Sequence, residues 1–198
     1  MKKTKQKILA AATELFLDKG VDRVGVREIA AKAEVNLSLM NYYFQSKENL
    51  LFTIFDMLVK DGALQTREIL ESNAPIEQKI NDYAIAYIDL LIEKPVLVSF
   101  VISVIHRNPE KIKTMDSAMG LYNSEIFCEQ LKTEAQAGRI KPVDPEQLFI
   151  SLISLILFPF TIRDLIMDKN SFSSKDYIKF MEERKTHVSS MIYSFLKI

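Results

Sequence analysis

The chain has 198 residues, 48% of them hydrophobic, with only 5 Gly and 6 Pro, which allows a substantial core and excludes extensive disorder. Its formal net charge is zero, yet residues 1–48 hold nine Lys or Arg against six Asp or Glu, so the positive surplus lies at the N-terminal end. The single cysteine, Cys128, excludes an internal disulfide framework.

Apolar residues recur with helical period from the start of the chain. A first helix is expected over about 4–19, because Ile8, Ala12 and Phe16 share one face and Gly20 follows the last turn. This helix precedes the segment that is most informative about function.

Residues 26–44 predict two short helices, 26–33 and 37–44, joined by a tight turn over 34–36. Isolated helices shorter than roughly 12–15 residues are marginal in water, so these two must pack on each other and on a neighbour. The residues spaced to do so are Ile29, Ala30, Ala33, Val35, Met40 and Phe44. The residues left pointing outward are Leu37, Ser38, Asn41 and Tyr42. A helix-turn-helix presents its second helix to the major groove of DNA in this way.

The rest of the chain is punctuated by a serine cap and by prolines. Ser46-Lys47-Glu48-Asn49 is typical of a helix start, and Pro is favoured at a first helical position. The further helices expected after this fourth one cover about 75–93, 95–106, 109–137, 145–168 and 174–196. Pro159 is expected to kink or divide the helix that contains it, because it lacks a backbone N–H. With no β alternation of useful length, the sequence predicts an all-α fold.

One longer pattern runs through the first quarter of the chain. It begins at Ile8-Leu9-Ala10-Ala11-Ala12, continues through Leu15-Phe16, Gly20, Val26-Arg27-Glu28-Ile29-Ala30, Ala33 and Val35, and ends in Tyr43-Phe44-x-x-Lys47-Glu48-x-Leu50. This combination resembles the TetR family of bacterial transcription regulators. The other three quarters match that family only in length and helical character. The resemblance implies a helix-turn-helix DNA-binding domain of three helices over 1–47 and a helical effector-binding and dimerisation domain over 48–198.

The chain departs from the family pattern at three places. The family usually has Gly in the turn, where this chain has Glu34; a non-Gly residue at positive φ costs energy, so a different turn geometry is open to it. The family usually has Ser or Thr before the second helix, where this chain has Val24-Gly25, with Glu28 at the N3 position of a capping box. The family's common Gly and Leu-Tyr are Ser38 and Met40-Asn41 here, which changes the expected operator rather than the DNA-binding role.

Four residues are candidates for reading DNA bases. Asn41 can donate and accept at once, which suits an adenine edge. Ser38 can hydrogen-bond a base or a phosphate, and Leu37 can pack on a thymine methyl group. Arg27 opens the preceding helix and can reach a base or a phosphate. The alternative for each is an ordinary solvated surface side chain.

Three residues are assigned to the DNA backbone, namely Tyr42, Tyr43 and Lys47. A phenol hydroxyl and an ammonium group can both bind phosphate, and such contacts set the register without reading sequence. The resemblance implies phosphate contacts at Tyr43 and Lys47. The alternative for the two tyrosines is partial burial against the first helix.

A pocket for a small effector is expected inside the C-terminal domain, between helices 75–93, 95–106 and 109–137 and the first part of the fourth helix. The candidate lining residues are Tyr83, Tyr87, Phe100, His106, Met115, Met119, Tyr122 and Phe127. An aromatic and Met-rich lining suits a hydrophobic or amphipathic molecule. The alternative is that these side chains simply pack the core.

Dimerisation is a physical need as well as a family expectation. One reading helix covers only a few base pairs, so two helices about one DNA turn apart, related by a twofold axis, are expected to read a palindromic operator. Helices 145–168 and 174–196 carry surplus apolar surface and are predicted to pair with their copies as a four-helix interface. The alternative is that this surplus belongs to the core of a monomer.

Signatures of enzymes, metal sites and membrane spans are missing from the sequence. His106 and His187, the two histidines, are far apart, and no Gly-rich phosphate loop or GxSxG motif occurs. We therefore expect no catalytic residues, no metal and no cofactor. The longest apolar stretch, 148–160, is 13 residues, shorter than the roughly 20 needed to cross a membrane. The segment MKKTKQK precedes an amphipathic helix rather than a signal peptide, which predicts a cytoplasmic location.

These observations predict a homodimeric, ligand-responsive transcription regulator, a repressor that a small effector releases from double-stranded operator DNA. The first rival is a DNA-binding dimer without a ligand, acting as a constitutive repressor or DNA-organising protein. The second is a helical enzyme or interaction module that keeps the motif only as a scaffold.

Overall fold

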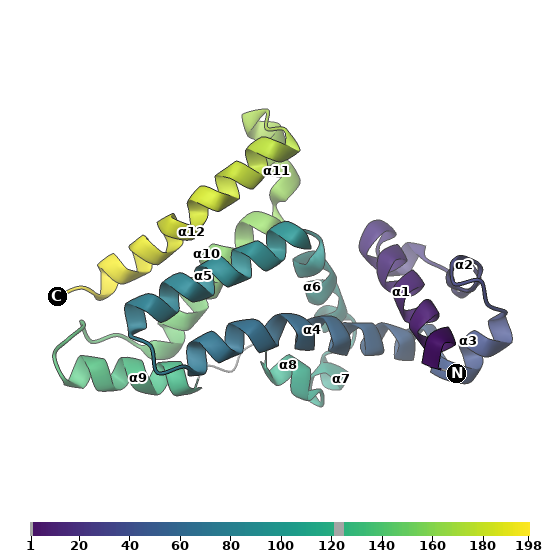
Figure 1. The fold of residues 1–198 in the computed structure, drawn as a ribbon, viewed down its shortest axis with the longest axis horizontal. Coiled ribbons are helices and arrows are strands. Elements are labelled where there is room, and N and C mark those ends of the chain that lie inside the picture. The colour runs from purple at the N-terminus through teal and green to yellow at the C-terminus, as the bar shows by residue number, and fades with distance from the viewer. Residues whose placement is uncertain (1, 121–124) are drawn as a thin grey trace. The chain divides into compact units, whose positions relative to one another are not determined.

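The computed structural model describes residues 2–120 and 125–198, except for the side chains of 2, 63–65, 119 and 120. The described residues form helices and loops with no β-strand, which confirms the predicted all-α fold (Figure 1). The helices are α1 (Lys2–Lys19), the 3₁₀ turn η1 (Val21–Arg23), α2 (Val26–Lys32), α3 (Leu37–Phe44), α4 (Lys47–Glu71), α5 (Ile76–Glu93), α6 (Leu97–Arg107), α7 (Pro109–Lys113), α8 (Asp116–Gly120), α9 (Glu125–Gln136), α10 (Pro145–Thr161), α11 (Arg163–Asn170) and α12 (Ser174–Leu196).

The chain packs as two compact units. Unit 1 comprises residues 1–61 and 99–119, and unit 2 comprises 62–98 and 120–198. Helices α4 and α6 therefore supply residues to both. These units are defined by packing. The division expected after residue 47, between a DNA-binding and an effector-binding domain, is a functional one and stays a prediction.

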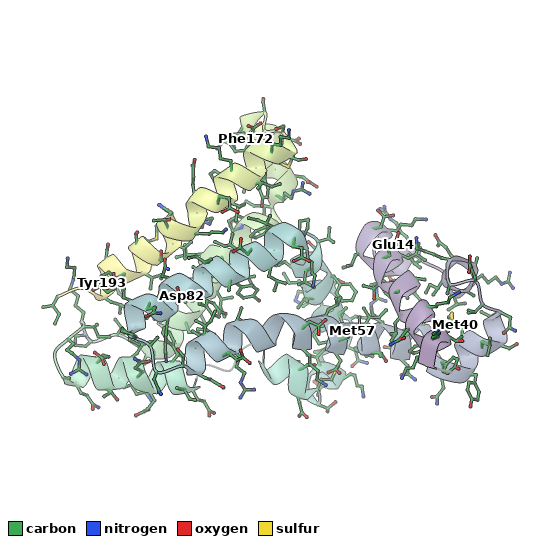
Figure 2. All side chains as sticks on the ribbon, in the orientation of Figure 1. Glu14, Met40, Met57, Asp82, Phe172 and Tyr193 are labelled. Atoms are coloured by element: carbon green, nitrogen blue, oxygen red, sulfur yellow. The ribbon has the colours of Figure 1, made fainter. Side chains whose placement is uncertain are left out.

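Unit 1 has its core where the first helices converge. In α1, Ile8, Ala12 and Phe16 recur every fourth residue and are buried, as a helix with one apolar face requires. The other large contributors are Ile29, Met40, Phe44, Leu50, Leu51, Ile54 and Phe55. Helix α2 contacts both α1 and α3, and Met40 lies inside this cluster (Figures 1 and 2). The pair of short helices is thus stabilised by packing rather than by its own length.

Unit 2 is a layer of long helices in which α5 packs along α12, and α10 contacts α5, α9 and α12 (Figure 1). The buried residues of α5, α10 and α12 are Ile80, Tyr83, Ala84, Ile88, Leu91, Phe149, Leu152, Ile156, Met181, Val188 and Ile192. Unit 2 also contains a buried lysine. Lys79 donates from Nζ to the backbone carbonyl of Leu70 at 2.8 Å. That carbonyl lies in the last turn of α4, where intrahelical donors run out. Burial lowers the pKa of the Lys79 ammonium.

Two of the predicted helices are wrong in extent. The helix expected over 109–137 is replaced by α7, α8 and α9, because α7 ends at Thr114, whose N–H turns back to the carbonyls of Lys111 and Ile112. The helix expected over 145–168 is divided into α10 and α11, which are bent by 64°. Prolines also behave less uniformly than predicted: Pro109 and Pro145 open their helices, whereas Pro75 is an N-cap and Pro95 lies before α6.

Pro159 lies inside α10, and the helix continues through it to Thr161. Because Pro has no N–H, the carbonyl of Leu155 one turn earlier loses its helical donor. Arg184 of α12 replaces that donor, with Nε 2.9 Å from the Leu155 oxygen. The hydroxyl of Tyr177, also in α12, donates to the carbonyl of Pro159 at 3.1 Å. These two bonds let the helix pass through the proline, so the break falls at Ile162 instead.

Within the described residues, no single helix has the length and apolarity to cross a membrane; α10 and α11 meet those two criteria only when taken together.

Candidate nucleic-acid interface

The turn between α2 and α3 is closed by three backbone hydrogen bonds. The N–H of Ala33, the C-cap of α2, donates to the carbonyl of Ile29. The N–H of Glu34 donates to the carbonyl of Ala31, and the N–H of Val35 donates to the carbonyl of Ala30 at 3.0 Å. This is the pattern of a Schellman motif, in which the residue directly after the C-cap, here Glu34, takes a left-handed conformation. Glu34 has φ 56°, so the turn keeps the geometry that Gly usually provides, and the different geometry that the sequence left open is not adopted.

Helix α3 begins at a well-formed cap. The side-chain oxygen of Asn36 accepts from the backbone N–H of Leu39 at 2.8 Å, which satisfies one of the free donors of the first turn. Met40 and Phe44 are 2% and 4% exposed and hold one side of α3 in the core of unit 1. The cap and these two anchors fix both the start and the rotation of the helix.

The opposite side of α3 is open, as predicted. Leu37, Ser38, Asn41 and Tyr42 are exposed, and Tyr42 keeps 69% of its surface accessible. Tyr43 is half-buried and meets Tyr42 edge-on, with ring centroids 5.2 Å apart. Leu39 is also exposed, at 38%, and the sequence analysis did not include it. Its spacing, three residues before Tyr42 on a helix anchored by Met40 and Phe44, was the signal available.

The charged side chains around α1 and α2 fall into two groups. Three lysines of unit 1 are paired across helices: Lys19 with Glu28 at 2.6 Å, Lys32 with Glu14 at 2.7 Å and Lys7 with Glu34 at 3.3 Å. The Lys19 hydrogen bond lowers the pKa of Glu28, and a backbone hydrogen bond from Gly25 adds to this. That second bond is the half of a capping box that a Gly N-cap permits.

The cations assigned to DNA lie elsewhere in unit 1. Arg27 is exposed near the start of α2. Lys47 is half-buried at the start of α4, where the Ser46 hydroxyl accepts from the N–H of Asn49 at 3.0 Å and confirms the predicted cap. The Lys47 ammonium lies 6.0 Å from the centre of the Phe16 ring. Its side chain is therefore held against α1, beside the helices of the motif.

An ion pair joins η1 to the end of α6. Arg107 donates from Nη2 to Asp22 Oδ1 at 2.6 Å, across 85 residues of sequence. This hydrogen bond and the charge of Arg107 lower the pKa of Asp22. The contact is partly exposed, so it orients the two segments more than it stabilises them.

The structure divides the candidate effector residues between the two units. In unit 2, Tyr83 lies edge-on to Tyr87, with centroids 5.6 Å apart, while Phe149 lies 6.2 Å from Tyr83 and 6.4 Å from Phe127. This aromatic cluster brings together three of the predicted residues and adds Phe149, which the sequence analysis missed. Burial raises the pKa of Tyr83 well above its usual value and that of Tyr87 to about 12.

The other candidates are not part of the aromatic cluster. In unit 1, Phe100 is buried, Met115 is half-buried and His106 is exposed near the end of α6. The side chain of Met119 and all of Tyr122 lie outside the described residues. Among the side chains that are described, no three His, Cys, Asp or Glu are placed to hold a metal ion.

The helices predicted to pair with a second copy have apolar residues on two faces. In α12, Met181, Val188 and Ile192 are buried, whereas Ile178, Met191 and Phe195 are exposed, the last at 61%. In α10, Ile150 and Phe158 are exposed at 39% and 60%. The inner faces belong to the core of unit 2, and the outer faces leave large apolar side chains in solvent.

Comparison with known proteins gives the same assignment for the first part of the chain. Residues 8–54 match the family described as bacterial regulatory proteins, tetR family. An HTH-type transcriptional repressor of Mycobacterium tuberculosis is 29% identical over 120 residues, 60% of this chain and 61% of that protein, so the match covers less than two thirds of the relative. The uncharacterized HTH-type transcriptional regulator YhgD of Bacillus subtilis is 26% identical over 75% of this chain and 82% of its own length.

The fold of the whole chain is also known from solved structures. The transcriptional regulator FadR from Bacillus subtilis, solved in complex with stearoyl-CoA, superposes with a TM-score of 0.71 at 18% identity, covering 96% of this chain and 98% of that one. The two sequence relatives are named as transcriptional regulators, one of them as a repressor. The helix-turn-helix and the residues around it, 8–54, are thus similar to the TetR family of bacterial regulatory proteins.

Proposed function

We propose that the chain is a homodimeric transcription regulator that binds a palindromic operator through α3 and is released by a small effector, acting as a repressor in the cytoplasm. The observation that carries this proposal is the fixed and open α3. Asn36 caps it, Met40 and Phe44 bury one side, and the other side faces solvent. A helix of 8 residues held in this way has no structural need for five exposed side chains of mixed chemistry.

Each exposed residue has a role that its chemistry supports. Asn41 binds an adenine edge, Ser38 a base or a phosphate, and Leu37 a thymine methyl group. Arg27 approaches from α2. Tyr42, Tyr43 and Lys47 contact phosphates and set the register. These last contacts give affinity that falls steeply with salt, because each neutralised phosphate releases a counterion.

The dimer would form through the outer faces of α10 and α12. Phe158 and Phe195 are exposed at 60% and 61%, and their burial against a second copy would recover apolar surface that unit 2 alone leaves in water. A twofold axis would then place two copies of α3 for consecutive major grooves. The M. tuberculosis relative, described as a repressor, supports the direction of regulation.

The effector would bind in the helical region that contains Tyr83, Tyr87 and Phe127. Aromatic walls with two phenols suit a molecule with a long apolar part, and FadR, whose fold this chain shares, was solved with stearoyl-CoA. Such a ligand releases DNA only if it binds one conformation of the dimer better than the other. Linkage then requires DNA and ligand to weaken each other by the same factor.

Substitutions in α3 and α4 test the DNA-binding role. On a duplex selected from genomic fragments, Asn41→Ala is expected to cost about 1–3 kcal/mol and to relax preference at one base position. Lys47→Ala is expected to weaken every sequence and to reduce the salt slope by about one. Asn73→Ala and Lys132→Ala, exposed in a loop and in α9, serve as matched controls. Unchanged fluorescence anisotropy titrations for Asn41→Ala and Lys47→Ala would rule the proposal out.

A further inference from the structure

The exposed side of α3 carries no charge. Its sequence, Leu37-Ser38-Leu39-Met40-Asn41-Tyr42-Tyr43-Phe44, contains no Lys, Arg, Asp or Glu. The accessible groups are one hydroxyl at Ser38, one amide at Asn41, the phenol of Tyr42 and two isobutyl groups, Leu37 at 36% and Leu39 at 38% exposure. Two of the five exposed side chains are therefore purely apolar.

The chemistry of the major groove limits what such a surface can read. Guanine offers two acceptors, and the commonest specific partner for them is Arg or Lys, neither of which α3 has. A leucine that packs against those acceptors would displace their water without replacing its hydrogen bonds, and this desolvation costs free energy. The one apolar group on a base edge in this groove is the C5-methyl of thymine.

Leu39 is well placed to use that methyl group. It lies in the first turn of α3, and the N-terminal residues of a recognition helix are those that reach base edges. The Asn36 oxygen holds its backbone N–H at 2.8 Å, so its Cα is fixed before any DNA arrives. Leu37 precedes it by two residues, and with 3.6 residues per turn the two leucines flank Ser38 on opposite sides.

We infer that α3 reads a half-site core made of A·T pairs, in which Leu39 and Leu37 pack on thymine methyl groups and Asn41 holds an adenine. This inference rests on the proposed DNA-binding function and specifies its operator class. Discrimination comes from methyl contact and a single amide rather than from bidentate guanine contacts. Arg27 belongs to α2, so any guanine that it reads lies outside the core under α3.

The first experiment is selection from a random duplex library with the purified full chain. The selected half-sites are expected to have A·T pairs at the positions under α3. Each thymine there is then replaced by deoxyuridine, which removes only the methyl group. Burial of one methyl predicts about a fourfold loss of affinity at one or two positions and no loss elsewhere.

Leu39→Ala connects that methyl effect to this side chain. The variant is expected to bind the thymine site more weakly than the wild type and to lose the difference between thymine and uracil at one position. Ile126→Ala, which removes an exposed aliphatic side chain from α9, is expected to keep the full difference. The comparison of thymine with uracil on the wild-type protein needs no substitution, so it stands even if a variant folds poorly.

The outcomes separate the two claims. G·C pairs selected under α3, or thymine and uracil bound equally by the wild type, overturn the A·T inference while an effect of Asn41→Ala leaves the DNA-binding proposal intact. A full thymine preference that survives Leu39→Ala overturns the role of Leu39. Failure to enrich any sequence, with Asn41→Ala and Lys47→Ala indistinguishable from the wild type, overturns both claims.

Discussion

Glu34 shows how a single residue can carry strain for a functional turn. At φ 56° its Cβ is crowded, a cost of roughly 1–2 kcal/mol that glycine does not have. The compensating ion pair with Lys7 is exposed and contributes little. Glu34→Gly should therefore raise the free energy of unfolding by about 0.5–1 kcal/mol, part of the relief being offset by the larger backbone entropy of glycine when unfolded.

Urea denaturation followed by circular dichroism measures this change. Glu34→Ala is the control, because it removes the carboxylate but keeps the Cβ, and it should lie within about 0.5 kcal/mol of the wild type. A Glu34→Gly variant less stable than Glu34→Ala would show that the turn is not strained.

The half-buried Tyr87, whose phenol has a raised pKa, makes stability depend on alkaline pH. Its folded-state pKa of about 12 exceeds the ordinary value of 10, so below pH 10 both states hold the proton and the stability is fully present. Between pH 10 and about 12 the unfolded chain releases the proton first, so the free energy of unfolding falls as the pH rises. Tyr87→Phe should show a shallower decline between pH 10 and 12 than the wild type.

Unfolding in urea at several pH values gives that slope. Equal slopes for Tyr87→Phe and the wild type would mean that the Tyr87 hydroxyl is solvated in the folded chain.

At the scale of elements, α12 supplies hydrogen bonds to backbone carbonyls of the proline-containing helix α10. The Leu155 carbonyl depends on Arg184 because Pro159 has no N–H to offer. Arg184→Met should cost about 1–3 kcal/mol, since it leaves a part-buried carbonyl without its donor. Pro159→Ala in that background supplies the missing N–H, so the cost of Arg184→Met should be smaller with Ala at 159 than with Pro.

A double-mutant cycle by thermal or urea unfolding isolates this coupling. We expect an interaction free energy of about 0.5–3 kcal/mol between the two positions. Strictly additive changes would show that Arg184 does not substitute for the missing helical bond.

Local patterns predicted the elements whose signals are local. The period of Ile8, Ala12 and Phe16, the cap at Ser46 and the two short helices around residues 34–36 are all present as expected. The helix break at Thr114 was not predicted, and the division expected at Pro159 falls three residues later, at Ile162. The carbonyls of Leu155 and Pro159 accept hydrogen bonds from α12, which no pattern in residues 145–168 records.

The candidate sites show the same limit. Periodicity indicated that Ser38 and Asn41 face outward, because Met40 and Phe44 mark the buried side. It did not single out Leu39, since a leucine on a short helix is ordinarily assigned to the core. For the effector residues, aromatic content predicted the cluster around Tyr83, but only the fold shows that His106 is exposed and in the other unit.

For the whole molecule, the outer faces of α10 and α12 are the proposed dimer interface. Phe195→Asp should shift the protein from dimer to monomer, because it places a charge within the surface that would be buried. Sedimentation velocity at several concentrations measures this. Lys132→Asp, which changes charge on an exposed residue of α9, should remain dimeric. A wild-type protein that sediments as a monomer at all concentrations would contradict the assembly.

Changing the spacing between half-sites tests whether two copies of α3 read DNA as a twofold pair. The affinity of the wild-type protein is measured on the selected palindrome and on the same duplex with five base pairs inserted at its centre, which turns the half-sites to opposite faces of the helix. We expect two chains per palindrome and at least a hundredfold weaker binding, on the order of 3 kcal/mol, after insertion. Equal affinity for both duplexes would contradict the twofold reading.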